Sequence, residues 1–399
     1  MKTVLVVTDP ISERASVQFE VLKMLLRGMK TNYNILVATP YIPNRQISEL
    51  KDSFNVNIHL LSSNKRIYQA LLTRFKKNES MLWAISWLFE GLFSSNSIAL
   101  KEKKLNVKDI INTSYTVPAL CKIYWNQATP PMITLEQMAK SNLLAKFSLL
   151  LFGWIFSLLD RKVLKKHLES SKKIAHNSEY LMDLYAEYGV NSKVVIHSPK
   201  EFHDFMPSDI PPSKDYVLAY IGKEVVVSTI LKIADLGVKV RSFGAKVPYG
   251  TSIYELRERA NYLGFVGEDE LSSLYHNALF TVFPFTEEPF GWVPLESMHY
   301  GTPVLSYKKQ GPSETIINGK TGWLVESEDE LIAKALEIWE TKQTGLSTED
   351  CEDRVKSFSS QTTIKKLISL LIYTEDIVNF RLTSTYGTSR MFSTTRPLS

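Results

Sequence analysis

Two glutamates, Glu288 and Glu296, lie on either side of a segment with the chemistry of a phosphate site. An apolar run over 278–283 predicts a buried strand before Glu288, and Pro294 suits the first position of a helix predicted over 294–300. A strand, a glycine-containing loop and a helix N-terminus offer unpaired backbone N–H groups and a helix dipole, which can hold a phosphate. Carboxylates beside it can accept hydrogen bonds from sugar hydroxyls. Taken alone, a glutamate pair at this spacing is better explained as a residue of a solvated loop and a residue of an ordinary acidic first turn.

The amino-acid sequence around the two glutamates is a more specific signal than the glutamate pair itself. The string EPFGWVPLESMHYGTPV, which begins at Glu288, is followed by GPSE from Gly311 and by NGKTGWLV from Asn318. Together they resemble the signature of the retaining glycosyltransferases of family four, in the group called glycosyl transferases group 1. The resemblance implies the GT-B fold, in which two Rossmann-like doubly wound domains face a cleft and a C-terminal helix crosses back to the first domain.

The resemblance also implies an activity and the residues that carry it. It implies retaining transfer of a sugar from a nucleotide-diphosphate sugar, with Glu296 on the ribose hydroxyls and Glu288 on those of the donor sugar. Lys223, at a predicted strand tip, would neutralise the departing diphosphate, so Glu288 and Lys223 are the expected catalytic residues. The other expected donor-binding residues lie in loops or at strand ends: Gly222, Gly244, Phe265, Val266, Phe290, Gly291, Trp292 and Val293.

Three departures or absences qualify this assignment. Relatives often carry a second basic residue shortly after the strand tip, but residues 224–229 hold none. Its absence would weaken stabilisation of the leaving group, or another lysine such as Lys246 would serve. No Asp-x-Asp motif occurs, and the seven histidines show no metal-ligand spacing such as HExxH, so we expect a metal-independent site with no cofactor besides the donor.

The acceptor-side residues are expected in the N-terminal half. A histidine common in the family is absent, and Asn126 or Gln127 would fill its space. Ser12 lies in a loop over 9–16, which follows the first predicted strand and is either a binding loop or a plain connection. His176 is expected to be a structural or cleft-edge group rather than a catalytic base.

Length and composition bound the class of protein. A chain of 399 residues is long enough for two domains, and 44% hydrophobic with 22% charged residues excludes wholesale disorder. A net charge of +5 does not by itself indicate a nucleic-acid partner. Cys121 and Cys351 are too few and too isolated for a disulfide scaffold or a zinc site, which favours a reducing compartment. The start, MKTVLVVTD, is typical of a strand rather than a signal peptide, so we expect a cytoplasmic protein.

Alternating apolar runs and amphipathic segments predict a doubly wound α/β sheet in each half. Strands are predicted at 3–7, 35–38, 56–61, 109–113, 121–125, from 173 and at 194–199, then at 215–221, within 238–244, at 278–283 and at 303–307. The expected boundaries are 1–199 for the acceptor-side domain, 200–214 for a proline-containing hinge, 215–360 for the nucleotide-sugar domain, 361–378 for the crossover helix and 379–399 for a flexible tail.

The most hydrophobic segment, 143–159, is too short to span a bilayer, which takes ~20 residues. A basic run follows it: Arg161, Lys162, Lys165, Lys166, Lys172 and Lys173. An apolar helix followed by a basic helix is typical of attachment to a membrane surface. A helix packed inside the domain, with a solvated basic successor, is slightly favoured for the apolar part. The acceptor would be a glycan, a lipid-linked sugar or a protein, and a lipid-linked acceptor would bring the enzyme to the inner face of the membrane.

Two other functional classes remain open from sequence. One is a different enzyme on the same fold, such as a sugar-nucleotide epimerase or a phosphorylase, although no lysine context for pyridoxal phosphate is evident. The other is a non-catalytic, membrane-associated protein that binds nucleotide sugars, which the missing cation and the missing histidine would favour.

Overall fold

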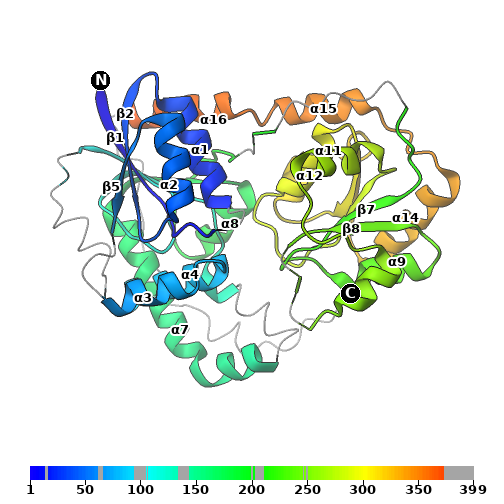
Figure 1. The fold of residues 1–399 in the computed structure, drawn as a ribbon, viewed down its shortest axis with the longest axis horizontal. Coiled ribbons are helices and arrows are strands. Elements are labelled where there is room, and N and C mark those ends of the chain that lie inside the picture. The colour runs from blue at the N-terminus through cyan, green and yellow to red at the C-terminus, as the bar shows by residue number, and fades with distance from the viewer. Residues whose placement is uncertain are drawn as a thin grey trace. The chain divides into compact units, whose positions relative to one another are not determined.

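The computed structural model describes residues 1–13, 17–61, 66–93, 105, 107–133, 143–198, 201–202, 211–245, 247–248 and 250–372. The chain divides into two compact units, each with its own sheet (Figure 1). Unit 1 takes its elements from the first 201 residues and from a helix that begins at Ser360, and unit 2 is built on Phe202–Ser359. Lys246, most of the predicted hinge and the predicted tail lie outside the described residues.

Unit 1 has a six-stranded sheet in which every neighbouring pair is parallel. Its strands are β1 (Lys2–Val7), β2 (Tyr33–Thr39), β3 (Asn57–Leu60), β4 (Asp109–Asn112), β5 (Cys121–Asn126) and β6 (Ser171–His176). The spatial order β3-β2-β1-β4-β5-β6 is that of a doubly wound sheet, and it reverses direction between β1 and β4. Residues Val4–Val7 are buried, as in a strand covered on both faces.

The helices of unit 1 include one from the far end of the chain. They are α1 (Val17–Met29), α2 (Asn44–Phe54), α3 (Arg66–Arg74), α4 (Glu79–Phe93), α7 (Leu143–Ser170), α8 (Glu179–Glu187) and α16 (Ser360–Ile372). Figure 1 shows α16 beside α1. A Cβ on Gly28 would lie 2.4 Å from Ile364, and Lys173 Nζ donates to the carbonyl of Leu370 at 2.8 Å. The C-terminal helix therefore crosses back to the first domain, as the resemblance implied.

Unit 2 has a five-stranded parallel sheet. Its strands are β7 (Val217–Tyr220), β8 (Val240–Phe243), β9 (Thr281–Phe283), β10 (Val304–Tyr307) and β11 (Gly322–Val325), in the order β11-β10-β9-β7-β8. Its helices are α9 (Val227–Asp235), α10 (Ile253–Ala260), α11 (Glu268–Asn277), α12 (Trp292–His299), α13 (Pro312–Thr315), α14 (Glu328–Thr341) and α15 (Thr348–Lys356). The order reverses between β7 and β9, so the prediction of two doubly wound α/β domains is confirmed.

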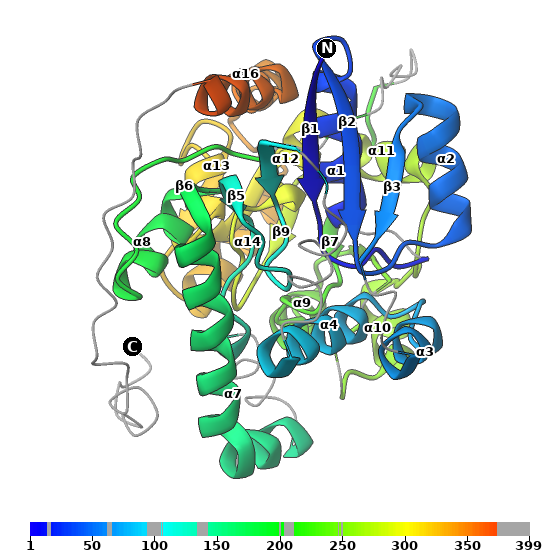
Figure 2. The same cartoon turned by 90° about the vertical axis from the view of Figure 1, so that its left-hand side faces the viewer.

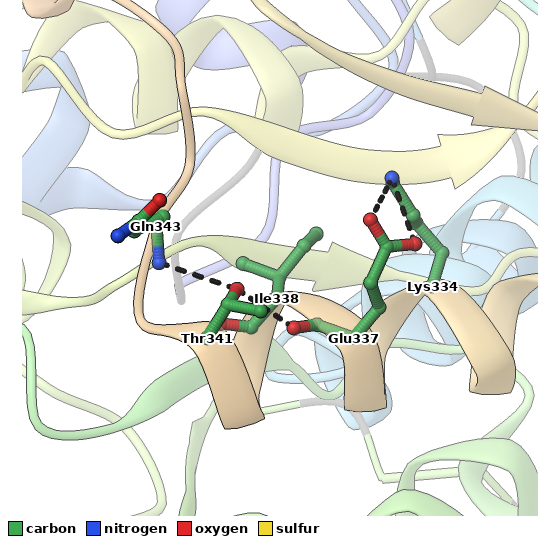
Figure 3. A network of polar contacts seen from close by, with 5 residues as sticks. All are labelled: Lys334, Glu337, Ile338, Thr341 and Gln343. Atoms are coloured by element: carbon green, nitrogen blue, oxygen red, sulfur yellow. Dashed lines mark hydrogen bonds and ion pairs between the residues drawn. The ribbon is translucent and has the colours of Figure 1, made fainter.

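The end of α14 shows how a surface helix of unit 2 terminates (Figure 3). Lys334 Nζ donates to the Glu337 carboxylate at 2.8 and 2.9 Å, and the Thr341 hydroxyl donates to the carbonyl of Glu337 at 2.8 Å. Lys342 then takes a left-handed conformation, with φ of 55°. Exposed pairs of this kind stabilise a helix by only a few tenths of a kcal/mol, and the helix ends where Lys342 leaves the helical conformation.

Two element predictions are wrong. The segment 194–199 is not a strand, because β6 ends at His176 and only Val195 pairs with it, as a single bridge. The predicted apolar and basic helices are one helix, α7, since residues 158–163 contain neither glycine nor proline to end it. No helix in the described part of the chain is both long and apolar enough to cross a membrane.

Candidate functional site

The expected donor-side residues of unit 2 gather at the carboxyl ends of β7 and β9. Gly222 and Lys223 directly follow β7, and Glu288 lies in the loop between β9 and α12. These are the two neighbouring strands between which the strand order reverses. In open α/β sheets ligands bind outside the carboxyl ends of the strands at such a switch point. The topology therefore places this group where a ligand site is expected.

Backbone contacts hold the two loops side by side. The N–H and the hydroxyl of Thr286 both donate to the carbonyl of Glu224, at 2.8 and 3.1 Å. Val225 forms an antiparallel bridge with Phe285. The loop after β7 is thus fixed against the loop after β9, and its two charged residues face the acidic loop.

The carboxylate of Glu288 occupies the beginning of α12. Its Oε1 accepts the backbone N–H groups of Phe290 at 3.2 Å and Gly291 at 2.9 Å. Gly291 precedes the helix in a left-handed conformation, with φ of 100°, which favours glycine. The N–H groups expected to contact sugar and phosphate are therefore arranged to hold an anion, and an internal carboxylate takes that place here.

The electrostatic surroundings of Glu288 are unusual for a carboxylate. Burial is the main cause that raises the pKa of Glu288 to about 7, and the negative charge of Glu224 acts in the same direction. The N–H groups of Phe290 and Gly291 and the charge of Lys223 oppose this shift. Lys223 itself is exposed. Glu288 thus changes charge near neutral pH, in a site that already holds a second acid.

A third loop, after β10, supports the acidic loop from the other side. Gln310 Oε1 accepts the N–H of Glu288 at 2.8 Å, and its Nε2 donates to Glu287 Oε2 at 3.2 Å. The N–H of Gly311 donates to the carbonyl of Glu288 at 3.1 Å. A Cβ on Gly311 would lie 2.3 Å from Phe290 Cα, so only glycine fits against this backbone.

Glu296 lies on α12 and is held by a different neighbour. The hydroxyl of Tyr275, on α11, donates to Glu296 Oε2 at 3.0 Å.

The predicted helix start at Pro294 is wrong by two residues: α12 begins at Trp292, which puts Glu296 in the second turn rather than the first. The first four N–H groups of a helix have no intrahelical partner, so proline is tolerated at the third position as well as at the first. Trp292 is partly buried and Val293 is buried.

The remaining donor-side residues are placed differently from one another. Gly244 has φ of 137°, and a Cβ there would lie 2.1 Å from the carbonyl oxygen of Ile221, so glycine is required. Gly222 is buried, and a Cβ on it would lie 2.3 Å from the ring of Tyr220. Phe265 is 71% exposed and free to meet a ligand, whereas Val266 is buried in the core of the unit.

Sequence reasoning missed two residues of this site. Glu224 was noted only as a departure from the family, yet its charge acts directly on Glu288. The signal was an acid immediately after the strand-tip lysine. Gln310 was not singled out, because a glutamine by itself gives no sequence signal of the contacts that it makes. Its only link with the motifs in the sequence is its position directly before Gly311-Pro312.

Unit 1 brings together three of the four expected acceptor-side residues. Asn126 ends β5 and pairs in register with His176 at the end of β6, with Gln127 next in the chain. Asn126 Nδ2 lies 3.5 Å from His176 Nδ1. Burial lowers the pKa of His176 to about 4, so the ring is neutral. Within the described residues, the buried His176 Nε2 and Gln127 Nε2 have no hydrogen-bond partner.

Ser12 lies in a different loop from this group, the loop after β1. It is buried, and its carbonyl oxygen accepts Gln46 Nε2 at 3.2 Å. Earlier in the same loop, the carboxylate of Asp9 accepts the Thr116 N–H at 3.0 Å and hydroxyl at 2.7 Å, and also the Ser114 hydroxyl. These contacts tie the loop after β1 to the loop after β4, which favours the interpretation as a structural connection; residues 14–16 lie outside the described residues.

The described side chains do not form a metal-binding site. Over the described ranges, no group of three or more His, Cys, Asp or Glu side chains is placed to hold a metal ion. Metal independence stays a prediction.

Parts of the chain are similar in sequence to known glycosyltransferases. Residues 249–357 match the model of the family described as Glycosyl transferases group 1. The chain is 37% identical over 71 residues to the alpha-1,3/1,6-mannosyltransferase ALG2 of Dictyostelium discoideum, which is 18% of this chain and 17% of that protein. It is 27% identical over 229 residues to a probable sucrose-phosphate synthase of Thermosipho melanesiensis, 51% of this chain and 52% of that protein. The matched segments thus span about half or less of these relatives.

The fold is shared over a much longer stretch. The structure of HepE from Anabaena, in complex with UDP and glucose, superposes with a TM-score of 0.62 over 93% of this chain and 99% of that chain. Sequence identity is 13%, so this likeness concerns the fold. It confirms the GT-B type of architecture expected from the motifs.

Proposed function

We propose that this chain, whose residues 249–357 match the model of the family Glycosyl transferases group 1, is a glycosyltransferase that transfers a sugar from a nucleotide-diphosphate sugar to an acceptor, with retention of configuration and without a metal ion. The observation that carries the proposal is the anion site at the start of α12, where two backbone N–H groups converge on the Glu288 carboxylate. It lies at the switch point of the sheet, where a nucleotide is expected.

The donor sugar and its diphosphate would bind at this helix tip. Sugar hydroxyls would donate to Glu288, and the N–H groups that it now occupies would turn to sugar or phosphate oxygens. As the bond between sugar and diphosphate breaks, negative charge grows on the leaving group, and the Lys223 cation and the α12 dipole would stabilise it. The acceptor would attack on the face from which the diphosphate leaves, which retains the configuration.

The nucleoside would lie along α11 and α12. Glu296, oriented by the Tyr275 hydroxyl, has one carboxylate oxygen fixed and would accept the ribose hydroxyls. Phe265, which is 71% exposed, offers an apolar ring to the base. A hexose donor is favoured, because the relatives include a mannosyltransferase and the HepE complex holds UDP and glucose.

The acceptor would meet the polar ends of β5 and β6. His176 Nε2 and Gln127 Nε2 are buried polar atoms whose hydrogen-bonding capacity is unused among the described residues, and such atoms usually bind water or ligand in proteins. A neutral imidazole and an amide suit hydroxyl groups of a glycan, a lipid-linked sugar or a glycosylated protein. Cys121 and Cys351 are free and buried, which supports a reducing, cytoplasmic setting.

A second candidate is a protein that binds nucleotide sugars without turning them over. Glu224 favours it, because a second acid beside Glu288 opposes the approach of a diphosphate. Incubation with radiolabelled donors and candidate acceptors separates the two. Free nucleotide together with labelled acceptor supports transfer. Tight donor binding with no label released, across glycan and lipid-linked acceptors, supports the second candidate.

A further inference from the structure

Helix α7 carries a stripe of large apolar side chains on its solvent face. The residues are Phe147 (59% exposed), Leu150 (80%), Leu151 (59%), Trp154 (63%) and Leu158 (55%). Their spacing of three or four residues places them on a single face of the helix. The later turns bury a different face in the core of unit 1, through Leu159, Val163, Leu164 and Leu168. The described part of unit 1 therefore leaves this apolar face of the helix uncovered.

The charge of the same helix changes sharply after the stripe. Arg161, Lys162 and Lys165 are exposed and begin within one turn of Leu158. The acid between Phe147 and Leu168 is Asp160, which is buried and bonded to the Tyr115 hydroxyl. The exposed surface of α7 is thus apolar for three turns and then mainly basic, with Glu169 pairing with Lys165 at 3.6 Å.

The end of α4 widens the apolar part. A Cβ on Gly91 would lie 3.1 Å from the Leu159 side chain, so α4 runs close against α7. Its last two residues, Leu92 and Phe93, are each 52% exposed. Figure 2 shows the beginning of α7 extending past α4 and away from the sheet of its unit. A projecting apolar surface of this kind marks an interaction site.

We propose that α7, with the end of α4, docks on the surface of a membrane that contains anionic lipids. The stripe covers the 12 residues from Phe147 to Leu158, about 16 Å of helix, which is enough to lie in the interface but not to span it. Its side chains enter the boundary between headgroups and acyl chains, about 5–10 Å deep, and Arg161, Lys162 and Lys165 lie among the phosphates. The cations next to the stripe favour an anionic lipid surface as the occupant, because each basic residue near such a surface adds to the affinity.

This surface corrects the interpretation slightly favoured from sequence, in which the apolar part was packed inside the domain. Composition alone could not distinguish a helix packed inside the domain from one attached to a membrane surface, since the same residues suit both. The docking inference concerns attachment and is independent of the transfer chemistry. It can therefore be tested without donor, and its failure leaves the transfer reaction untouched.

Co-sedimentation of the full chain with vesicles tests the apolar stripe. The chain is expected to bind vesicles of phosphatidylcholine mixed with phosphatidylglycerol. Leu150→Ser combined with Trp154→Ser should weaken that binding at least about tenfold, because interfacial affinity scales with buried apolar area. Ile67→Ser in α3 is the matched control, at 72% exposure on the same unit, and should bind like the parent. Absence of binding by the parent chain, or equal binding by the double variant, overturns the proposal.

The cations are tested by replacing Arg161, Lys162 and Lys165 together with glutamine. Each basic residue near an anionic surface contributes about fivefold to affinity, so binding to the mixed vesicles should fall about a hundredfold. Binding to pure phosphatidylcholine should change little. Thermal unfolding of each variant checks that the fold persists, as exposed positions predict. Equal losses on both kinds of vesicle would show that charge plays no part and would refute the anionic preference.

Trp154 gives a direct signal of depth. Its emission should shift to shorter wavelength on vesicles and should be quenched by brominated acyl chains, whereas Trp154→Phe should bind and lose that signal. Sedimentation velocity without vesicles addresses the competing occupant. A dimer that Leu150→Ser dissociates, together with no vesicle binding, would assign the stripe to self-association and overturn the membrane proposal.

Discussion

The side-chain amide of Gln310 joins Glu287 to Glu288. Its oxygen accepts the Glu288 N–H at 2.8 Å and its nitrogen donates to the Glu287 carboxylate at 3.2 Å. Gln310 reaches both from a left-handed conformation, with φ of 54°, which costs a residue other than glycine about 1 kcal/mol or more. The acidic loop is therefore held by a strained neighbour, and its shape depends on that side chain.

Replacing Gln310 by glycine should distinguish the effect of its backbone strain on stability from the effect of its side-chain hydrogen bonds on the shape of the acidic loop. Gln310→Gly relieves the left-handed strain but removes both hydrogen bonds, so thermal stability should change by no more than about 1 kcal/mol. Discrimination between a nucleotide sugar and the free nucleotide should fall, as measured by calorimetric titration. Lys342→Gly, at φ of 55° at the end of α14, is the matched control and should leave donor binding unchanged. Unaltered discrimination in Gln310→Gly would show that the amide only braces the loop.

Glu288 should make sugar binding depend on pH. Because its pKa is raised to about 7, the carboxylate that accepts sugar hydroxyls forms as the pH rises through neutrality, and affinity for the donor relative to free nucleotide should rise with it. Glu288→Gln should abolish this dependence. The stability effect has the opposite sign: a pKa raised above its ordinary value of 4.5 stabilises the fold below that pH, and the contribution is lost as pH rises through about 7. Denaturant titrations of both proteins across this window check it.

Substitutions of Glu288 and Glu296 should change ligand binding in different ways. At a hundred times its dissociation constant, a bound donor stabilises a protein by about 2.7 kcal/mol, which a thermal-shift panel of UDP-, GDP- and ADP-sugars can detect. Glu296→Ala should lose the shift with every ligand, since the ribose contact is common to all. Glu288→Ala should keep the shift with nucleotide and lose the difference between sugars. Equal shifts in the parent and in both variants would contradict the two roles.

Gly311 should tolerate no side chain. Gly311→Ala would press a Cβ against Phe290 Cα at 2.3 Å, a backbone atom that cannot swing aside, so a loss of about 1–3 kcal/mol is expected together with weaker donor binding. Gly267→Ala is the control, because that position faces open space at φ of −72° and precedes α11, where alanine costs no more than about 1 kcal/mol. Chemical denaturation compares them, and equal losses would remove the packing argument.

Lys223 should matter for transfer and not for stability. Its side chain is exposed, so Lys223→Gln should leave the unfolding temperature unchanged. If its charge acts on the leaving diphosphate, the variant should lower kcat by about tenfold or more with a smaller change in KM. Lys320→Gln, at an exposed lysine in the same unit, should retain parental kinetics. A parental kcat in Lys223→Gln would reassign the charge stabilisation to another group.

Sequence reasoning located the sheets well and the loops poorly, for a physical reason. Strands buried on both faces, such as β1 and β9, are continuous apolar runs, so their positions follow from composition alone. The place of Glu224 beside Glu288 depends instead on bonds between two loops more than sixty residues apart in the chain. The left-handed Gln310 and the exposed face of α7 are equally invisible to local patterns, because each is defined by what does or does not pack against it.

The Glu288 carboxylate at the tip of α12 also has a kinetic consequence. Because this carboxylate already accepts the Phe290 and Gly291 N–H groups, the resting protein offers fewer free donors to stray anions such as inorganic phosphate. A donor that binds here would exchange one set of hydrogen bonds for another, and on its departure the tethered Glu288 carboxylate would return to the N–H groups without diffusion. The Glu288 side chain would then favour the donor over simple anions and would speed release of the nucleotide. The protein would bind the donor somewhat less tightly as a result.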